Sequence, residues 1–154
     1  MYNRKSKTAA ILALITAVLL IGFMIMLPFS RYDTEGGNGF AAFFIFLFSF
    51  FGYIVIYASA IPFTIVALIF GLKMLRTQSR DALISLNTRM LIATCVLLPF
   101  LAAGIFGSAG SIFQSELGQL PIVYTIIVAV SYFACLLAQI VTIVALKKSP
   151  KESI

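Results

Sequence analysis

The stretch FAAFFIFLFSFFGYIVIYASAIPFTIVALIFGL, residues 40–72, decides the fold because it contains no charged side chain. Three further runs are as apolar, and only Glu116 interrupts them: residues 8–27, 90–120 and 121–146. The whole chain of 154 residues is 62% hydrophobic and 10% charged, whereas about a quarter of the residues in soluble proteins are charged. A helix crosses the hydrocarbon core of a bilayer with about 20 apolar residues. The sequence therefore predicts an all-α integral membrane protein.

The apolar runs predict a four-transmembrane-helix bundle with up-down-up-down topology, and residues 1–154 are expected to form a single membrane domain. The first run exceeds the roughly 7–15 apolar residues of a secretory signal, and we interpret it as an uncleaved helix. Ser79 stands where an N-cap is expected, so the third helix should begin before it enters the bilayer. Residues 107–120 are expected to lie along the outer interface until Pro121 opens the last helix. The predicted spans are about residues 8–27, 42–72, 88–107 and 121–146.

Basic residues predict the orientation of the chain. Three precede the first helix, four lie between the second and third, and three follow the fourth: Arg4, Lys5, Lys7, Lys73, Arg76, Arg80, Arg89, Lys147, Lys148 and Lys151. The remaining one of the eleven is Arg31, in the first outer connection. Positively charged segments stay in the cytoplasm, so both termini are expected on the cytoplasmic side of the plasma (cytoplasmic) membrane, the bacterial inner membrane. Because topology accounts for the net charge of +6, we expect weak contact with anionic lipid and no nucleic acid partner.

Residue types missing from the predicted helices exclude most membrane chemistry. The chain has no His, and no Asp, Glu, Lys or Arg lies inside a predicted helix core. Intramembrane hydrolysis, proton relays and ion-coupled transport usually need such groups, so we expect no enzyme activity and no cofactor. Cys95 and Cys135 differ in depth by about 9 Å, which disfavours redox chemistry. Asp33 and Glu35 are too few ligands for calcium, so we expect a flexible turn there and no metal site.

Small residues recur at helical spacing and predict the faces on which the helices pack. In lipid, no hydrophobic force drives helices together, and small side chains allow their backbones to approach closely. The expected packing residues, taken helix by helix, are Ala13 and Ala17, then Ala60, Ala67 and Gly71, then Ala103 and Gly107, and finally Ala134 and Ala138.

Larger polar residues on the same faces define a candidate ligand site: Tyr53, Tyr57, Thr64 and Gln139. Thr64, Gln139 and the prolines Pro62 and Pro99 lie about 12–16 Å from the cytoplasmic basic residues, close to the midplane. Transporters often bind substrate where helices are interrupted at that depth. The same residues also fit a packing interpretation, in which the polar groups join helices by hydrogen bonds and the prolines only kink them.

The start of the second helix suits either the outer membrane interface or a protein partner. Seven of the twelve residues 40–51 are phenylalanine, and residues 40–72 would form a helix of about 50 Å against about 30 Å of hydrocarbon. The first functional hypothesis is a non-enzymatic accessory or immunity-type subunit that packs against another membrane protein, either a larger one or, as a homo-oligomer, another copy. The second is a carrier or pore for a small neutral or lipophilic molecule, lined by the four candidate residues.

Overall fold

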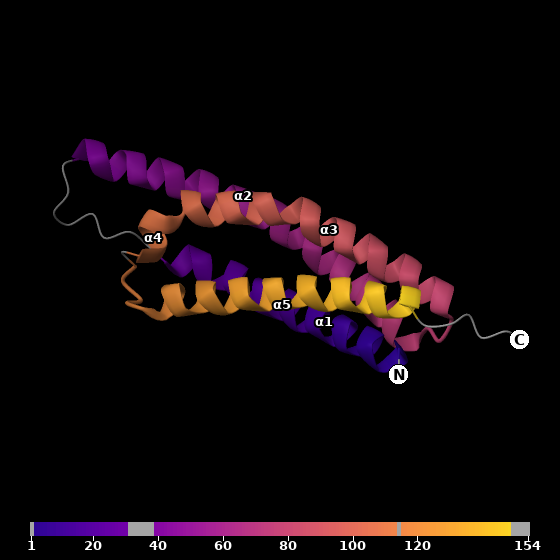
Figure 1. Ribbon diagram of the computed structural model, residues 1–154. Helices are drawn as coiled ribbons and strands as arrows, with labels where there is room; N and C mark the ends of the chain where they lie inside the picture. The colour runs from indigo at the N-terminus through magenta and orange to yellow at the C-terminus, as the bar shows by residue number, and fades with distance from the viewer. Residues whose placement is uncertain (1, 31–38, 114, 149–154) are drawn as a thin grey trace, which may run out of the picture.

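A computed structural model describes residues 2–30, 39–113 and 115–148 of the chain (Figure 1). The elements in chain order are α1 (Tyr2–Met26), the 3₁₀ turn η1 (Leu27–Phe29), α2 (Gly39–Arg76), α3 (Arg80–Gly107), α4 (Ala109–Phe113) and α5 (Leu120–Lys148). Four segments, Arg4–Phe29 and the helices α2, α3 and α5, are long and apolar enough to cross a membrane. The predicted fold class, an all-α bundle of four membrane-spanning helices, is confirmed.

The helices extend further than the apolar runs at the end of the bundle that holds the termini. The largest difference is in α3, which begins at Arg80 and not at residue 88. Ser79 is the N-cap residue, as its position predicted, with extended backbone and a carbonyl that accepts a hydrogen bond from the Leu83 amide at 3.0 Å. Its side chain makes no capping bond. Helix α3 therefore has more than two turns, residues 80–89, before its charge-free run. Leu83 and Asn87 in these turns are buried in the bundle.

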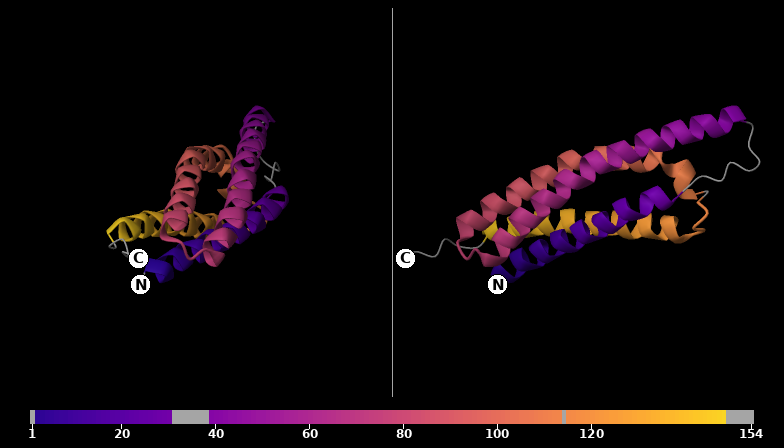
Figure 2. Two further views of the ribbon diagram at one scale, coloured as in Figure 1. Left: turned by 90° about the vertical axis from the view of Figure 1, so that its right-hand side faces the viewer. Right: turned by 180° about the vertical axis from the view of Figure 1, so that it is seen from behind.

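The long helices run alternately up and down, and each packs on two neighbours. Helix α1 contacts α2 and α5, and α3 contacts the same two helices from the opposite corner. The view along the bundle shows this four-cornered arrangement (Figure 2, left). The start of α1 and the end of α5 lie at the same end, together with the α2–α3 connection (Figure 1). The described basic residues therefore gather toward one end, while the side of the membrane on which that end lies remains a prediction.

Arg80 joins the α2–α3 connection to the last turn of α5. Its Nε donates to the Leu146 carbonyl oxygen at 2.8 Å, and its Nη2 donates to the Lys147 carbonyl oxygen at 3.3 Å. The last carbonyls of a helix have no partner within the helix and carry the negative end of its dipole. The Arg80 guanidinium donates hydrogen bonds to these carbonyls and places a positive charge at the negative end of the dipole. Arg80 therefore also fixes the end of α5.

The opposite end of the bundle is closed by α4. This short helix contacts α2, α3 and α5, and its residues Ser111 and Ile112 are buried. The segment 107–120 was expected to lie along the interface, and part of it instead folds into the bundle end. The chain then turns at Gly118, whose φ of 67° suits glycine, and α5 starts at Leu120 just before Pro121. Residues 31–38, with the turn expected around Asp33 and Glu35, lie outside the described residues.

Candidate functional site

The two tyrosines of the candidate site join α2 to α1 and to the turn that follows it. The Tyr53 hydroxyl donates to the Ser30 carbonyl oxygen at 2.9 Å, and the Tyr57 hydroxyl donates to the Met24 carbonyl oxygen. Carbonyls near the end of a helix lack partners within it, and an unpaired hydroxyl in hydrocarbon costs several kcal/mol. Each tyrosine therefore satisfies its own hydroxyl and a backbone group of the neighbouring segment. This is the arrangement that the packing interpretation requires.

Gln139 lies far from these tyrosines along the bundle axis. On α5, Thr142 contacts the Lys5 carbonyl at 3.2 Å, and Ser131 contacts Thr16, with 2.7 Å between their hydroxyl oxygens. Because α1 and α5 run in opposite directions, Gln139 lies between these two contacts, level with about residue 8 of α1. The level of Tyr57 is Met24, so roughly 24 Å of helix separates them at 1.5 Å per residue. The four candidate residues therefore do not converge on one cavity.

Thr64 occupies an intermediate level and makes no contact that would define a ligand site. It is buried, and its hydroxyl has no hydrogen-bond partner among the described residues. Its neighbour Phe63 packs against Tyr132 in a tilted arrangement, with 4.9 Å between ring centroids. The prolines expected beside it, Pro62 and Pro99, are both exposed, and α2 and α3 continue through them as helices. These positions do not support the pocket interpretation, in which prolines interrupt helices beside the ligand site, because both prolines face outward.

A buried polar column follows α5 from the end with the termini to the middle of the bundle. It consists of the buried residues Thr142, Gln139, Cys135 and Tyr132 and the half-buried Ser131, and it is extended by groups from other helices. The Tyr132 hydroxyl donates to the Thr94 carbonyl of α3 at 2.8 Å, and the Gln139 Nε2 lies 3.2 Å from the Cys135 Sγ. These are neutral groups, and most of them join helices. The column supplies hydrogen-bonding groups, and it contains no Asp, Glu, Lys, Arg or His.

Asn87 extends this column from α3, and sequence reasoning did not single it out. It is fully buried on α3, and its Nδ2 donates to the Gln139 carbonyl oxygen at 2.9 Å. Starting the third helix at residue 88 left Asn87 in a loop, although the Ser79 N-cap implies that it lies two turns inside the helix. The signal was present in the spacing, because the buried residues of α3 include Leu83, Asn87, Met90 and Thr94, at steps of four, three and four.

The two buried amides are only partly satisfied. Asn87 Oδ1 and Gln139 Oε1 have no hydrogen-bond partner among the described residues. The assignment of oxygen and nitrogen in Asn87 is fixed by its bond to a carbonyl. If the two atoms of Gln139 were exchanged, its Nε2 would be unpaired in place of its Oε1. In either case one polar atom of each amide remains without a partner.

Most predicted packing residues lie inside the bundle. Ala13, Ala17, Ala60, Ala67 and Gly71 are buried, and Gly107, Ala134 and Ala138 are half-buried. The prediction was wrong for Ala103, which is exposed, and its neighbour Gly104 is buried in its place.

The closest crossing of α2 and α3 lies at Gly104 and at a residue that was not predicted, Gly52. A Cβ on Gly52 would lie 2.5 Å from the Ser108 amide nitrogen and 2.8 Å from the Gly104 carbonyl oxygen. Real Cβ atoms essentially never approach other heavy atoms so closely, so only glycine fits at this crossing.

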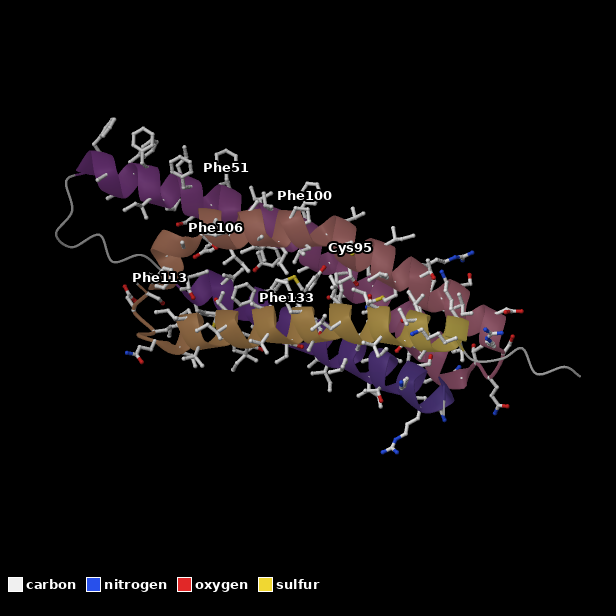
Figure 3. The ribbon with its side chains drawn as sticks, in the orientation of Figure 1. Phe51, Cys95, Phe100, Phe106, Phe113 and Phe133 are labelled. Carbon is white, nitrogen blue, oxygen red and sulfur yellow. The ribbon has the colours of Figure 1, made fainter. Side chains whose placement is uncertain are left out.

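The outer part of α2 forms a second candidate site, which we call the Phe flank, residues 40–51. All seven of its phenylalanines are exposed: Phe40, Phe43, Phe44, Phe46, Phe48, Phe50 and Phe51. Phe51 points away from the other helices (Figure 3), and the start of α2 extends past the rest of the bundle in both side views (Figures 1 and 2). The Tyr53 bond to Ser30 places the Phe flank beyond the described end of the α1 segment. Beyond Ile45, whose side chain lies beside Gly110 of α4, little of the bundle remains to cover it.

No protein-family model matches the sequence, and neither a curated protein nor a solved structure matches the chain.

Proposed function

We propose that the protein is a non-enzymatic accessory or immunity-type subunit of the bacterial cytoplasmic membrane, and that it binds a larger membrane protein through the Phe flank. One observation carries the proposal. The Phe flank exposes seven aromatic rings, and the start of α2 extends past the rest of the bundle.

The length of α2 supports the proposal that the Phe flank extends beyond the hydrocarbon core. Its 38 residues span about 57 Å, whereas the hydrocarbon core is about 30 Å thick. A tilt of about 40°, the upper end of the range for transmembrane helices, lengthens the path through hydrocarbon to roughly 39 Å, or about 26 residues. Counted from Leu72, the last apolar residue before Lys73, this path reaches about residue 47. The phenylalanines that remain beyond it are Phe40, Phe43, Phe44 and Phe46.

Aromatic rings outside the hydrocarbon gain free energy by leaving water or the headgroup layer for a protein surface. Each large aromatic side chain buries roughly 150–250 Å² when it is covered. Large exposed apolar patches of this kind mark interaction sites. Aromatic residues are also enriched at the centres of protein interfaces.

The interior of the bundle supports a packing role better than transport. A carrier lined by Tyr53, Tyr57, Thr64 and Gln139 needs these side chains to meet around one substrate. The tyrosine hydroxyls instead bind the carbonyls of Ser30 and Met24, and Gln139 lies about 24 Å away along the axis. The accessory-subunit function does not require such a convergence.

Site-specific photo-crosslinking tests the proposal. A benzophenone amino acid replaces Phe46 in the Phe flank, and a matched variant carries it at Phe133 on the lipid-facing side of α5; the two side chains are 62% and 54% exposed. On irradiation in the native membrane, the Phe46 variant is expected to form one discrete adduct with a different, larger protein, and the Phe133 variant only lipid adducts. Absence of a protein adduct at Phe46 would contradict the proposal. An adduct of two copies of the chain would replace the larger partner with a homo-oligomer.

A further inference from the structure

Among the buried polar atoms without a partner, the two amide oxygens differ from the rest. Ser6, Ser49 and Thr64 also have unpaired hydroxyls among the described residues. A serine or threonine hydroxyl in a helix can rotate to bond a carbonyl one turn earlier in its own helix, so it needs no external partner. The side-chain amide oxygens of Asn87 and Gln139 cannot be satisfied in this way, because each needs a donor from another group.

The two amides belong to one place in the bundle. Asn87 of α3 donates its Nδ2 hydrogen to the backbone carbonyl of Gln139 on α5, at 2.9 Å. The Gln139 side chain extends toward Cys135, one turn further along the column, with 3.2 Å between Nε2 and Sγ. Both side chains are completely buried. Two acceptors are therefore unsatisfied on neighbouring helices, joined through a single hydrogen bond.

On one side of the pair the α1 positions carry small side chains, and toward the end of the bundle lies a buried apolar cluster. At the level of Gln139, near residue 8 of α1, the neighbouring α1 residues Ala9 and Ala10 are fully buried, and Gly71 packs against the Ala10 carbonyl. The α1 positions at this level therefore carry small side chains. Toward the end of the bundle, Leu83 lies one turn before Asn87 on α3 and Leu146 lies two turns after Gln139 on α5, and both belong to a buried apolar cluster with Ala10 and Met74.

We propose that Asn87 and Gln139 form an internal water-binding site, in which enclosed water donates hydrogen bonds to the two amide oxygens. Native proteins seldom leave buried amide oxygens unpaired, and ordered water is the usual partner where protein groups are lacking. Water fits this site because it can donate to an unpaired oxygen or accept from an unpaired Nε2, whichever way the Gln139 amide is placed. The site lies inside the bundle, away from the Phe flank, and does not depend on the proposed function.

Nuclear magnetic resonance on the wild-type protein in nanodiscs tests the site with water itself as the probe. Through-space cross-peaks with the water resonance are measured in the rotating frame for the Asn87 Hβ and Gln139 Hγ protons, which do not exchange with solvent. We expect a cross-peak from each, with the sign of a through-space contact and not that of chemical exchange. The methyl groups of Val128, which is fully buried in the apolar core, are the dry control in the same sample and should show none.

A pair of variants connects the water to the two amides. The double variant Asn87→Leu/Gln139→Leu removes both acceptors and should abolish the water cross-peak at the Cys135 Hβ protons. Thr64→Val removes a buried hydroxyl elsewhere and should leave that cross-peak intact. The proposal is overturned if the wild-type Asn87 and Gln139 protons show no cross-peak to water, or if their partner is the resonance of another molecule. The wild-type measurement decides this even if the double variant fails to fold.

Discussion

Replacing Gly52 by alanine should separate α2 from α3 at their closest crossing. The new methyl carbon would lie 2.5 Å from the Ser108 nitrogen, 2.7 Å from the Gly107 carbonyl carbon and 2.8 Å from the Gly104 carbonyl oxygen. Ordinary contact begins at 3.4 Å, so the helices must move apart by several tenths of an ångström. All three neighbours are backbone atoms, so no side chain can rotate away.

The magnitude follows from two opposing terms. Overpacking a close contact costs about 1–3 kcal/mol, and a contact made only with backbone belongs at the upper end. Alanine in place of glycine within a helix returns up to about 1 kcal/mol through lower backbone entropy in the unfolded chain. The net loss of unfolding free energy is therefore about 2 kcal/mol for Gly52→Ala, which corresponds to roughly a thirtyfold smaller folded-to-unfolded ratio.

Denaturant titration in mixed micelles, followed by helix content, measures this ratio. Gly39→Ala is the matched control, because a Cβ at Gly39 meets nothing within 4 Å, and its unfolding free energy should change by less than about 0.5 kcal/mol. If Gly52→Ala is as stable as the wild-type protein or more stable, the close crossing of α2 and α3 is refuted.

Two further predictions concern the tyrosines and the topology. Tyr57→Phe removes only the hydroxyl that bonds the Met24 carbonyl, and should lower the unfolding free energy by about 0.6–2 kcal/mol in the same titration; no loss would mean that this hydroxyl does not join α2 to α1. In a cysteine-free background, a single cysteine in place of Gln78 should be labelled from the cytoplasm and one in place of Gly37 from outside. The opposite labelling would overturn the orientation inferred from the basic residues.

The number and type of helices could be predicted from sequence because both depend on composition alone. A charge-free run long enough to cross the bilayer forms a helix whatever it packs against, since every backbone group must be satisfied within the segment. The same argument fails at the helix ends outside the hydrocarbon. There the apolar signal stops, and α3 continues through a polar segment that only the N-cap at Ser79 marks.

Side-chain positions around each helix were harder to predict than the helices themselves. Successive side chains on an α-helix differ in direction by about 100°. Ala103 therefore faces outward, while its neighbour Gly104 faces the core. Composition gives no rule for choosing between two adjacent small residues. The partner does so here, because Gly52 of α2 meets Gly104 and only glycine at both positions allows that approach. Asn87 is a different case, because its spacing from Leu83, Met90 and Thr94 places it on the inner face once the helix is extended back to the Ser79 N-cap.

The candidate ligand site was predicted on the correct faces of the helices but without their relative heights. Sequence depth was counted separately from each basic segment, and those segments are not level with one another in the bundle. Antiparallel pairing then fixes the heights: Tyr57 meets Met24, whereas Gln139 lies between the levels of Lys5 and Thr16. Residues on one predicted inner surface can therefore lie several helical turns apart.

The close crossing at Gly52 also affects how the Phe flank can act. This crossing lies one residue after the end of the Phe flank, and Ile45 within the Phe flank lies close to Gly110 of α4. The outer part of α2 is thus attached to α3 and α4 on one side while its phenylalanines remain exposed on the other. A binding surface that is already held in its bound geometry loses less conformational entropy on association than a free segment does. Loosening the crossing by Gly52→Ala should therefore weaken binding at the Phe flank as well as stability, although Gly52 itself is buried against α3.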